Sequence, residues 1–427
     1  MRIIQEKLID RKVISSIAKF LDDNEVIVLH GTRQVGKTSI IKILISSVLK
    51  SKIPESNIVY FDLEDFGLVE LCDKGVEKVI DYLTGINCDF SKKIYLFIDE
   101  IQYLKNPSSF LKLFYDRYKT KVKIIVSGSS SFGIKSKFKN SLAGRTVNFE
   151  IFTLDFEEFL WFKEKKIRLG AKLPDILHNE LRDLYTEYAL MGGYPAIVLE
   201  KSIGKKEFKL KQIINTYIKK DIRDLADIRN INKFNILLKL LASQSGNLLN
   251  ILELSNTLGI ARQTIEDYLF IMENTYIIKR IYPFYKNIRS ELTKMPKVYL
   301  EDSGIANILV NKTFSRVISG SLFENSVYMN LRRNSSVENI YFWRTNKGQE
   351  VDFILDGRKL IPAEVKICFR DKLIKNALYF SNKYNTGDVI CITLNKSKNS
   401  KYRNVKQLYP WEIYNILDNK HYISDHC

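Results

Sequence analysis

The chain has 427 residues, too many for one ordinary hydrophobic core, so roughly two to four domains are expected. Hydrophobic residues make up 45% of it, no apolar run approaches the ~18 residues of a membrane span, and the five cysteines form no C-x-x-C pair, which argues against a membrane protein and against a zinc or disulfide framework. The formal net charge of +18 favours a polyanionic partner such as nucleic acid, although a basic, soluble surface explains it equally well.

Residues 1–24 predict a helix, because apolar residues recur at roughly helical spacing from Ile3 to Leu21. Residues 25–30 then predict a short buried strand. The next eight residues read GTRQVGKT, at positions 31–38, and fit the phosphate-loop pattern G-x-x-x-x-G-K-[ST] at every fixed position. A helix is expected directly after this loop, at residues 39–45. The motif therefore has the strand and the helix that a phosphate-binding loop requires on either side.

Each fixed residue of the loop has a chemical reason. The two glycines let the backbone curl so that its N–H groups point at phosphate oxygens, and the helix N-terminus adds its positive dipole end. Lys37 is expected to reach the β- and γ-phosphates, while the Thr38 hydroxyl ligates Mg²⁺. The residues expected to bind the nucleotide are Gly31, Arg33, Gly36, Lys37, Thr38 and Ser39.

Two carboxylates follow the third predicted strand. A second strand is expected at residues 57–62 and a helix at about 69–83, and the apolar run from residue 93 then ends in Asp99 and Glu100. Asp99 lies where an acid that supports Mg²⁺ belongs, at the carboxyl end of a parallel strand. Glu100 is placed to polarise the attacking water. An acidic strand end without a role is the alternative.

A fourth strand, at residues 122–127, runs into the serine-rich sequence GSSS at 128–131. A polar residue there is expected beside the γ-phosphate, with Ser129 as the first choice and Ser130 as the second. A simple serine-rich turn explains the same pattern equally well. Two features favour an ATPase that uses a catalytic glutamate over a GTPase. One is the strand predicted at residues 57–62, between the phosphate loop and the strand that ends in Asp99. The other is the absence of the guanine-reading sequence N-K-x-D.

Basic residues dominate residues 117–149, where no acid occurs after Asp116 until Glu150. This run predicts either a DNA-facing edge or a solvated face. Within it, Arg145 is expected to contact a γ-phosphate as an arginine finger, in its own chain or in a neighbouring one, or else to anchor a loop. A fifth strand at residues 146–154 would complete the first domain.

Residues 155–228 predict a helical, lid-like subdomain with a turn at 191–195. Residues 229–285 then predict two helices, a glycine turn at Gly259, a third helix and a strand-like pair, which is the layout of a winged helix-turn-helix. The third helix opens with ARQT at 261–264, so Arg262, Gln263 and Thr264 are the expected base or phosphate contacts. Acidic residues in the next turn weaken the DNA interpretation, and a winged helix used only for domain packing is the alternative.

A second set of charged residues lies between positions 320 and 370. Glu324 is expected on a helix, Asp352 on one strand, and Glu364 and Lys366 on the same face of the next strand. This pattern is typical of metal-dependent phosphodiester cleavage, with Glu324, Asp352 and Glu364 holding Mg²⁺ and Lys366 orienting water. A structural hairpin with paired charges, or a fold that has lost catalysis, remains open.

Together these motifs resemble those of prokaryotic AAA-type P-loop ATPases with a C-terminal nuclease-like domain of the PD-(D/E)XK type. The resemblance implies ATP binding and a winged helix between the ATPase domain and the C-terminal domain. One departure is that Val351 stands where a proline usually precedes the first aspartate. The sequences that carry the resemblance are GTRQVGKT at 31–38, FIDEIQ at 97–102, SGSS at 127–130, LAGR at 142–145, GGYP at 192–195, KVYLED at 297–302, EVDF at 350–353 and EVK at 364–366.

The expected fold class is α/β: a P-loop NTPase core with a parallel sheet, a helical and winged-helix region, and a C-terminal domain like that of restriction endonucleases. The expected function is a Mg²⁺-dependent ATPase that acts on DNA, or an ATP-gated module that binds protein or nucleic acid without cutting it. ATP and Mg²⁺ are the expected cofactors, an oligomer is possible, and a reducing cytoplasm is the expected location. The expected domains are residues 1–154, 155–228, 229–285 and 286–427.

Overall fold

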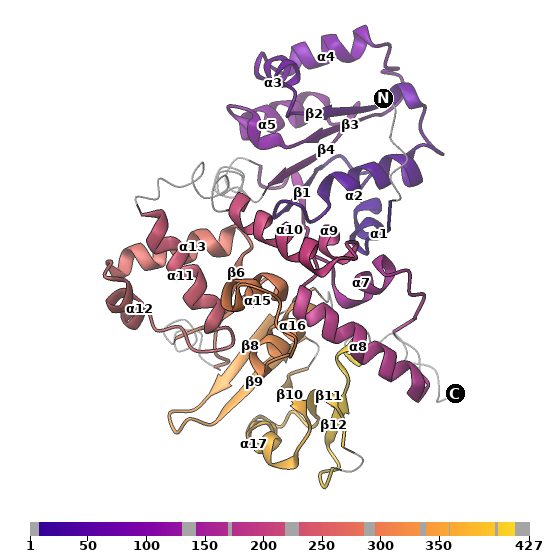
Figure 1. Cartoon of the computed structure of the whole chain (residues 1–427). Coiled ribbons are helices and arrows are strands. Elements are labelled where there is room, and N and C mark those ends of the chain that lie inside the picture. The colour runs from indigo at the N-terminus through magenta and orange to yellow at the C-terminus, as the bar shows by residue number, and fades with distance from the viewer. Residues whose placement is uncertain are drawn as a thin grey trace. The chain divides into compact units, whose positions relative to one another are not determined.

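The computed structural model divides into two compact units (Figure 1). The N-terminal unit comprises Met1–Phe152, Asn215–Ile228 and Asn274–Tyr276, and the C-terminal unit comprises Thr153–Ile214, Arg229–Glu273 and Ile277–Cys427. Because the chain passes between the units several times, neither unit is one continuous stretch of sequence. The structure describes residues 8–129, 142–169, 173–217, 230–285, 295–333, 339–357, 359–397 and 400–414.

A five-stranded parallel sheet forms the centre of the N-terminal unit, with the strand order β2-β3-β4-β1-β5. Its central strands are apolar and buried, as expected for strands covered on both faces. β4 lies between β1, which leads into the phosphate loop, and β3, which ends at Asp99. The strands are β1 (Val26–Gly31), β2 (Ile58–Asp62), β3 (Ile94–Asp99), β4 (Val122–Ser129) and β5 (Thr146–Glu150).

The helices of this unit differ from the sequence prediction at two places. The helix expected at 69–83 is two helices, because Gly75 adopts a left-handed backbone with φ of 109° between them. The lead-in is helical only from Val13 to Ala18 within its described residues. The helices are α1 (Val13–Ala18), α2 (Lys37–Ile43), a π-helical continuation η1 (Leu44–Leu49), α3 (Phe66–Asp73), α4 (Val76–Gly85) and α5 (Pro107–Tyr118), with short 3₁₀ turns η2 (Glu55–Asn57) and η3 (Ile101–Tyr103).

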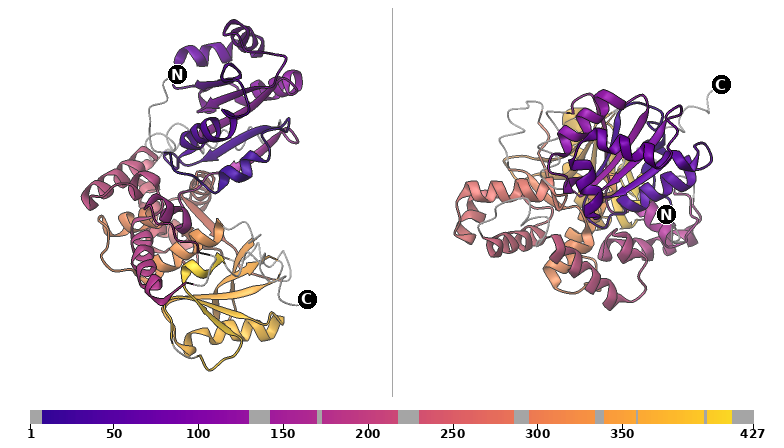
Figure 2. Two further views of the ribbon diagram at one scale, coloured as in Figure 1. Left: turned by 90° about the vertical axis from the view of Figure 1, so that its right-hand side faces the viewer. Right: turned by 90° about the horizontal axis from the view of Figure 1, so that it is seen from above.

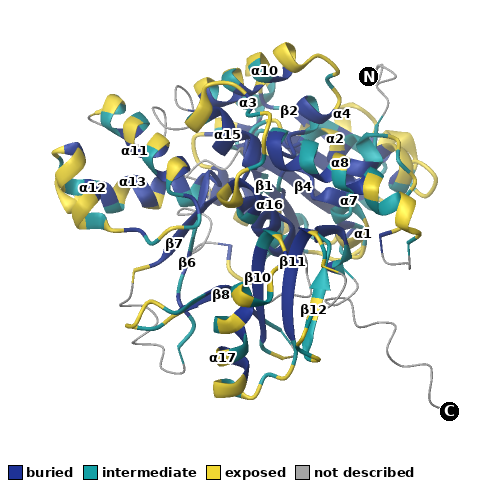
Figure 3. Ribbon diagram, turned by 60° about the horizontal axis from the view of Figure 1, so that its bottom comes forward, coloured by how far each residue is buried: buried dark blue, intermediate teal, exposed yellow. Residues whose placement is uncertain are grey.

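A mixed five-stranded sheet, of order β12-β11-β10-β9-β8, lies in the C-terminal unit (Figure 2). β8, β9 and β10 are antiparallel neighbours, whereas β10, β11 and β12 run parallel. Figure 3 shows β10 and β11 in the colour of buried residues. The strands are β8 (Asn339–Arg344), β9 (Glu350–Asp356), β10 (Ile361–Cys368), β11 (Val389–Asn395) and β12 (Val405–Leu408).

Helices make up most of the rest of the chain, as predicted for residues 155–228. In the described part of the chain, none of them is long and apolar enough to cross a membrane. The α/β fold class with a parallel N-terminal sheet, helices and a C-terminal sheet is thus confirmed. The helices are α7 (Phe156–Phe162), α8 (Asp175–Met191), α9 (Pro195–Val198), α10 (Ile203–Thr216), α11 (Ile231–Ser243), α12 (Ile251–Leu258), α13 (Arg262–Asn274), α15 (Ser303–Asn311), α16 (Gly320–Arg332) and α17 (Lys375–Tyr384), with 3₁₀ turns η5 (Asp371–Ile374) and η6 (Pro410–Glu412).

The predicted winged-helix region contains three helices followed by a two-stranded sheet. Asn230 and Asn250 cap α11 and α12, because each side chain accepts a hydrogen bond from a backbone N–H of the first turn. Gly259, with φ of 62°, ends α12. β6 (Ile278–Ile281) pairs in antiparallel fashion with β7 (Lys297–Leu300). The second strand of this pair therefore lies beyond residue 285, where the sequence placed a domain boundary, and the four-domain division stays a prediction.

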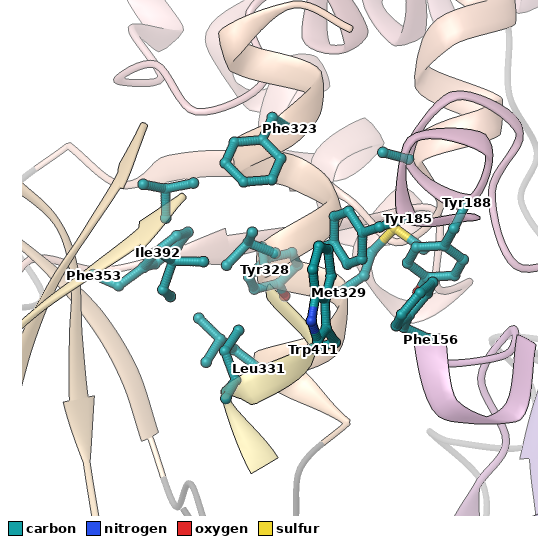
Figure 4. Packing of buried hydrophobic residues seen from close by; sticks show 14 of the residues in the cluster. Phe156, Tyr185, Tyr188, Phe323, Tyr328, Met329, Leu331, Phe353, Ile392 and Trp411 are labelled. Atoms are coloured by element: carbon teal, nitrogen blue, oxygen red, sulfur yellow. The ribbon is translucent and has the colours of Figure 1, made fainter. Parts of the chain in front are cut away.

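Aromatic side chains form the core of the C-terminal unit (Figure 4). Phe156 of α7 packs edge-on against Tyr185 of α8, with ring centroids 4.9 Å apart. Trp411 is fully buried against the same cluster, and its indole N–H donates to His178 at 3.1 Å. Buried aromatic rings of this size contribute much of the apolar area that holds a domain together.

Gly304 tests how tightly α15 is packed. A Cβ atom at Gly304 would lie 2.1 Å from the Met191 carbonyl oxygen, which is backbone and cannot move aside cheaply. We expect Gly304→Ala to lower the free energy of unfolding by about 1–3 kcal/mol, as overpacking does. Chemical denaturation of the purified chain measures this. Gly320→Ala is the control, because nothing lies within 4 Å of its added Cβ. Equal midpoints for both variants would contradict the tight packing.

Candidate nucleotide-binding site

The phosphate loop joins β1 to α2 in a tightly curled backbone. A Cβ at Gly31 would lie 2.0 Å from the Ile151 carbonyl oxygen, so only glycine fits there. Gln34 and Gly36 both have left-handed backbones, with φ of 63° and 98°. Gly36 is the N-cap of α2, so the N–H groups of the first helical turn, which have no partner within the helix itself, lie at the end of the loop. These features give the loop the shape of an anion cradle.

Lys37 lies inside this cradle and is 5% exposed. Its Nζ donates to the carbonyl oxygens of Gly31, at 3.0 Å, and Thr32, at 2.8 Å, so the ammonium group lies across its own loop. Phosphate oxygens are stronger partners for an ammonium group than neutral carbonyls are. The arrangement therefore holds a positive charge where the sequence placed the β- and γ-phosphates.

Asp99 is the acid of the site that accepts the most hydrogen bonds. It ends β3 and is 3% exposed. Its Oδ2 accepts hydrogen bonds from Thr38 Oγ1 at 2.6 Å and from Tyr60 Oη at 3.0 Å. Its Oδ1 accepts from the Ser127 hydroxyl and, at 3.2 Å, from the Glu100 backbone N–H. A buried carboxylate needs such donors, because an unpaired one is costly to desolvate.

Tyr60 responds to this acid in turn. Burial raises the pKa of the Tyr60 hydroxyl, and the adjacent Asp99 carboxylate raises it further. Tyr60 therefore stays a hydrogen-bond donor to Asp99 at any physiological pH. The result is one carboxylate whose orientation is fixed from β2, β4 and α2 at once.

Glu100 follows Asp99 in a left-handed backbone, with φ of 57° and ψ of 46°. Such a conformation is uncommon for a residue other than glycine, and it turns the chain sharply at the end of β3. The Glu100 side chain is half-buried, and the Gln102 amide donates to its Oε2. Glu100 is thus held next to Asp99, at the same edge of the sheet.

The two predicted serines lie at the edge of what the structure describes. Ser129 is the last residue of β4, and its Cα pairs in parallel register with that of Gly31. Its backbone therefore lies beside the start of the phosphate loop. The Ser129 side chain and the whole of Ser130 lie outside the described residues, so a contact with the γ-phosphate stays a prediction.

Arg145 lies at the opposite end of the sheet from the loop. Its carbonyl accepts from the N–H of Val26, the first residue of β1, whereas the loop follows the last residue. A strand of this length spans roughly 17 Å. The Arg145 side chain pairs with Asp116 at 2.9 Å. In this structure Arg145 therefore anchors a loop, a role toward the phosphates of its own chain has no geometric support, and a role in a neighbouring chain stays a prediction.

The C-terminal unit brings its predicted charges together around Lys366. Asp352 lies on β9, Glu364 and Lys366 lie on β10, and Glu324 lies on α16. Lys366 Nζ contacts Asp352 Oδ2 at 2.5 Å and Glu364 Oε2 at 2.9 Å. Asp352 Oδ2 also accepts from the Val365 backbone N–H at 2.8 Å.

A second lysine, Lys297 of β7, lies on the other side of this cluster. It is 2% exposed and contacts Glu350 at 2.6 Å and Glu324 at 3.9 Å. Glu324 Oε1 also accepts from the Tyr299 hydroxyl at 2.6 Å. A pocket of about 360 Å³ opens beside Glu324 and Lys366. Four carboxylates and two ammonium groups thus share one largely buried cluster.

The charges of this cluster shift one another's protonation. Burial and the Asp352 carboxylate raise the pKa of Glu324 to about 7. The same two causes hold the pKa of Glu364 well above its usual range. Burial alone would raise the pKa of Asp352, but Lys366 and Lys297 outweigh it and lower that pKa. Asp352 is therefore the member that stays ionised and pairs with Lys366.

Metal binding at this cluster does not fit the arrangement. Among the residues that the structure describes, no group of three or more His, Cys, Asp or Glu side chains is placed to hold a metal ion. Lys366 bridges Asp352 and Glu364, which the sequence assigned to Mg²⁺ together with Glu324. The predicted nuclease centre therefore appears as an ion-pair cluster, and metal-dependent cleavage stays a prediction.

The residues that open α13 give mixed support to a nucleic-acid contact. Arg262 and Gln263 are exposed and Thr264 is half-buried. Gln263 donates to Asp267 at 3.0 Å on the same helix face. Glu266 pairs with Arg280 of β6 at 3.0 Å. Two acids near the start of the helix reduce its attraction for phosphate, so a DNA-reading role for α13 stays a prediction.

Family comparisons divide the chain into three matched regions. Residues 23–160 match the AAA domain, residues 182–316 match a domain of unknown function (DUF8612), and residues 319–414 match another domain of unknown function (DUF4143). The first match covers the phosphate loop, Asp99 and Glu100. Most of the N-terminal unit is thus similar to the AAA domain.

Similar proteins extend over most of the chain. An uncharacterized protein of Methanocaldococcus jannaschii is 26% identical over 381 residues, which cover 86% of this chain and 81% of that protein. An uncharacterized protein of Mycobacterium tuberculosis is 23% identical over 356 residues, which cover 82% of this chain and 72% of that protein. The ORC1 protein of Aeropyrum pernix, solved in complex with DNA, is 12% identical with a TM-score of 0.30 and covers 69% of this chain and 90% of its own.

Several contacts of the AAA domain were not predicted from the sequence. Ser127 and Tyr60 hold Asp99, yet they lie inside strands whose pattern indicates only burial. Arg11, assigned to the lead-in helix, is 7% exposed and donates to the Val35 carbonyl of the phosphate loop at 2.8 Å. The polar hydroxyls of Ser127 and Tyr60 within apolar runs were the available signal, but pairing with Asp99 depends on the strand order.

Lys366→Met tests the ion-pair cluster. The change leaves Asp352 buried without its nearest cation, so we expect the free energy of unfolding at pH 7 to fall by about 3 kcal/mol, at the lower end for a broken buried pair. The loss should shrink as the pH is lowered toward 4, because protonation of the carboxylates removes the uncompensated charge. Urea unfolding at several pH values measures both effects.

Lys359→Met is the control for this change, because Lys359 is 57% exposed and its partner Asp388 is 3.9 Å away. Its effect should stay within about 0.5 kcal/mol at every pH. A Lys366→Met variant as stable as this control at pH 7 would contradict the ion-pair cluster.

Proposed function

We propose that the chain is a Mg²⁺-dependent ATPase whose reaction centre is formed by the phosphate loop, Asp99 and Glu100. The observation that carries the proposal is the 2.6 Å hydrogen bond from Thr38 to Asp99. It joins the loop that would bind phosphate to the acid that would support a metal ion, across the intervening strand β4. The match of residues 23–160 to the AAA domain supports the same function.

The residues of the site fit both ATP and Mg²⁺. The curled loop and the buried Lys37 ammonium group suit the triphosphate. Hydroxyl and carboxylate oxygens are the ligands that Mg²⁺ prefers, and Thr38 and Asp99 supply them at one place. Thr38 would hold the ion, and Asp99 would support Thr38 by accepting the hydrogen bond from its hydroxyl. Bound there, Mg²⁺ would offset the negative charge of the phosphates.

Glu100 is the group proposed to activate water. Its carboxylate lies at the same strand end as Asp99 and is oriented by Gln102. A carboxylate can accept a proton from water that is aligned with a phosphoryl group, while Lys37 stabilises the charge that develops on the phosphate oxygens. The left-handed turn at Glu100 supports this role, because strained backbones are concentrated at functional sites.

The target of the ATPase is proposed to be DNA. The net charge of +18, the helical layout of residues 231–281 and the pocket of about 360 Å³ beside Lys366 support a nucleic-acid partner. The Lys366 bridge between Asp352 and Glu364 favours gripping DNA over cutting it. An ATP-gated switch that contacts a protein is the alternative, and the acidic residues Glu266 and Asp267 in the second turn of α13 favour it.

Glu100→Gln and Lys37→Ala test the reaction centre. We expect Glu100→Gln to lower kcat for ATP by about 10²–10⁴-fold while ATP still binds, since the amide cannot accept the proton. Lys37→Ala should weaken binding itself. Phosphate release and a fluorescent ATP analogue measure the two effects. Glu55→Gln and Lys52→Ala are exposed controls that should behave as wild type. Unchanged turnover in Glu100→Gln would remove Glu100 from the reaction.

Adding duplex or single-stranded DNA to the same assay tests the target. We expect DNA to raise ATP turnover and its strands to remain intact in Mg²⁺, because the C-terminal cluster is filled by its own lysines. Gel analysis of the DNA from each reaction checks this. Mg²⁺-dependent cutting that Asp352→Ala abolishes would establish a nuclease instead. Turnover indifferent to DNA would point to the protein-binding switch.

A further inference from the structure

Residues Asn274–Tyr276 belong to the N-terminal unit, although the residues on both sides of them belong to the C-terminal unit. Asn274 ends α13, and Ile277 leads into β6. Tyr276 is 4% exposed and has a left-handed backbone with φ of 57°. This conformation is unfavourable for a bulky residue and persists only where the surrounding contacts fix it.

The Tyr276 hydroxyl lies between two residues at the start of the phosphate loop. It is 2.6 Å from His30 Nδ1 and 3.0 Å from Glu150 Oε1. His30 immediately precedes Gly31, and its Cα pairs with that of Glu150 in the β1–β5 register. The three side chains therefore come together at the carboxyl end of β1, where the loop begins.

Hydrogen-bond chemistry gives this line of groups a direction. An ionised Glu150 can only accept, so the single Tyr276 proton is donated to it. We assign the His30 Nδ1 proton as the donor to the Tyr276 oxygen, which is the tautomer this arrangement requires. Each member thus depends on the next, and removing the Tyr276 oxygen breaks both bonds together.

A second set of contacts connects Tyr276 to the phosphate loop. The Phe152 ring packs edge-on against Tyr276, with centroids 5.9 Å apart. Arg11 Nη2 donates to the Phe152 carbonyl at 2.9 Å, and its Nη1 donates to Val35 of the phosphate loop at 2.8 Å. The loop is therefore connected to Tyr276 at two places: at His30, just before its first residue, and at Val35, within the loop.

Phe152 and Tyr276 both lie where the chain leaves the N-terminal unit. Phe152 is its last residue before Thr153, and Tyr276 is its last residue before Ile277. On the other side of the segment, the Thr275 and Tyr217 hydroxyls are 2.6 Å apart and buried. Phe152 and Tyr276 are thus each joined by their next peptide bond to a residue of the other unit.

We infer that Tyr276 is a positioning residue that couples the phosphate loop to the C-terminal unit through the His30–Tyr276–Glu150 line. The inference rests on the proposed ATP binding. Through this line, nucleotide at the loop changes the setting of the chain at Ile277, and by linkage a ligand of the C-terminal unit changes the affinity for ATP by the same factor. On this proposal, a residue about 240 positions beyond the loop helps to set the position of the loop.

Tyr276→Phe in the full chain tests this directly, because phenylalanine keeps the ring and removes both hydrogen bonds. Hydrogen exchange is measured at residues 277–281 with and without a non-hydrolysable ATP analogue, together with KM and kcat. Wild type should show a nucleotide-dependent change in exchange, and Tyr276→Phe should lose it while KM rises about three- to tenfold. Tyr268→Phe, whose hydroxyl is 3.4 Å from the Asn230 carbonyl of the C-terminal unit, should behave as wild type.

His30 supplies the rescue that a merely structural role would not show. His30→Asn keeps an N–H near the Nδ1 position and should retain the exchange response, whereas His30→Ala should lose it. The effects of His30→Ala and Tyr276→Phe should not add in the double variant, because both break one line. If Tyr276→Phe fails to fold, His30→Ala carries the test from the other side.

The outcomes separate this inference from the proposed function. Wild type that binds no ATP analogue would overturn both. Wild type that binds it without any exchange difference at 277–281, or a Tyr276→Phe variant that keeps the difference, would overturn the coupling and leave the ATPase intact. Additive losses in the double variant would also contradict the line.

Discussion

The hydrogen bond between Thr38 and Asp99 is the constraint on which the candidate site depends. The two residues are 61 positions apart: Thr38 lies in the first turn of α2, after β1 and the phosphate loop, and Asp99 ends β3, with β4 between the two strands in the sheet. The bond therefore forms across the carboxyl end of β4. Burial of Asp99 makes the bond obligatory, because its carboxylate needs the donors that Thr38, Tyr60 and Ser127 provide.

The same strand end also fixes how the site connects to the rest of the chain. The loop begins where β1 and β5 pair, and there Glu150 and Phe152 meet Tyr276, which arrives from far along the sequence. A strained backbone occurs at Gln34, Glu100 and Tyr276, which are the loop, the proposed base and the proposed coupling residue. Strain at these positions is consistent with parts held in place by their surroundings.

The sequence predicted what depends on local pattern. The phosphate loop, the acid pair after β3 and the five strands of the parallel sheet follow from spacing and apolar runs, and the α/β class is confirmed. Long-range pairings could not be predicted, because Tyr276, Arg11 and Ser127 gain their partners only once the strand order is set. The helix broken at Gly75 and the strand pairing of β7 with β6 were missed for related reasons, since a glycine is often tolerated in a helix and a pairing partner has no local signal. In the C-terminal unit the charged residues lie on the helix and strands that the sequence predicted for them. How Lys366 pairs with the acids could not be predicted, because it depends on side-chain packing.

The most direct test of the reaction centre is calorimetric binding of ATP to the full chain, with and without Mg²⁺, in wild type and in Asp99→Asn. Asp99→Asn keeps the shape of the side chain but removes the charge that would support the ion. Wild type should bind ATP more tightly in Mg²⁺, and Asp99→Asn should bind with an affinity that Mg²⁺ no longer improves. Equal dependence on Mg²⁺ in both proteins would contradict the role of the Thr38–Asp99 pair.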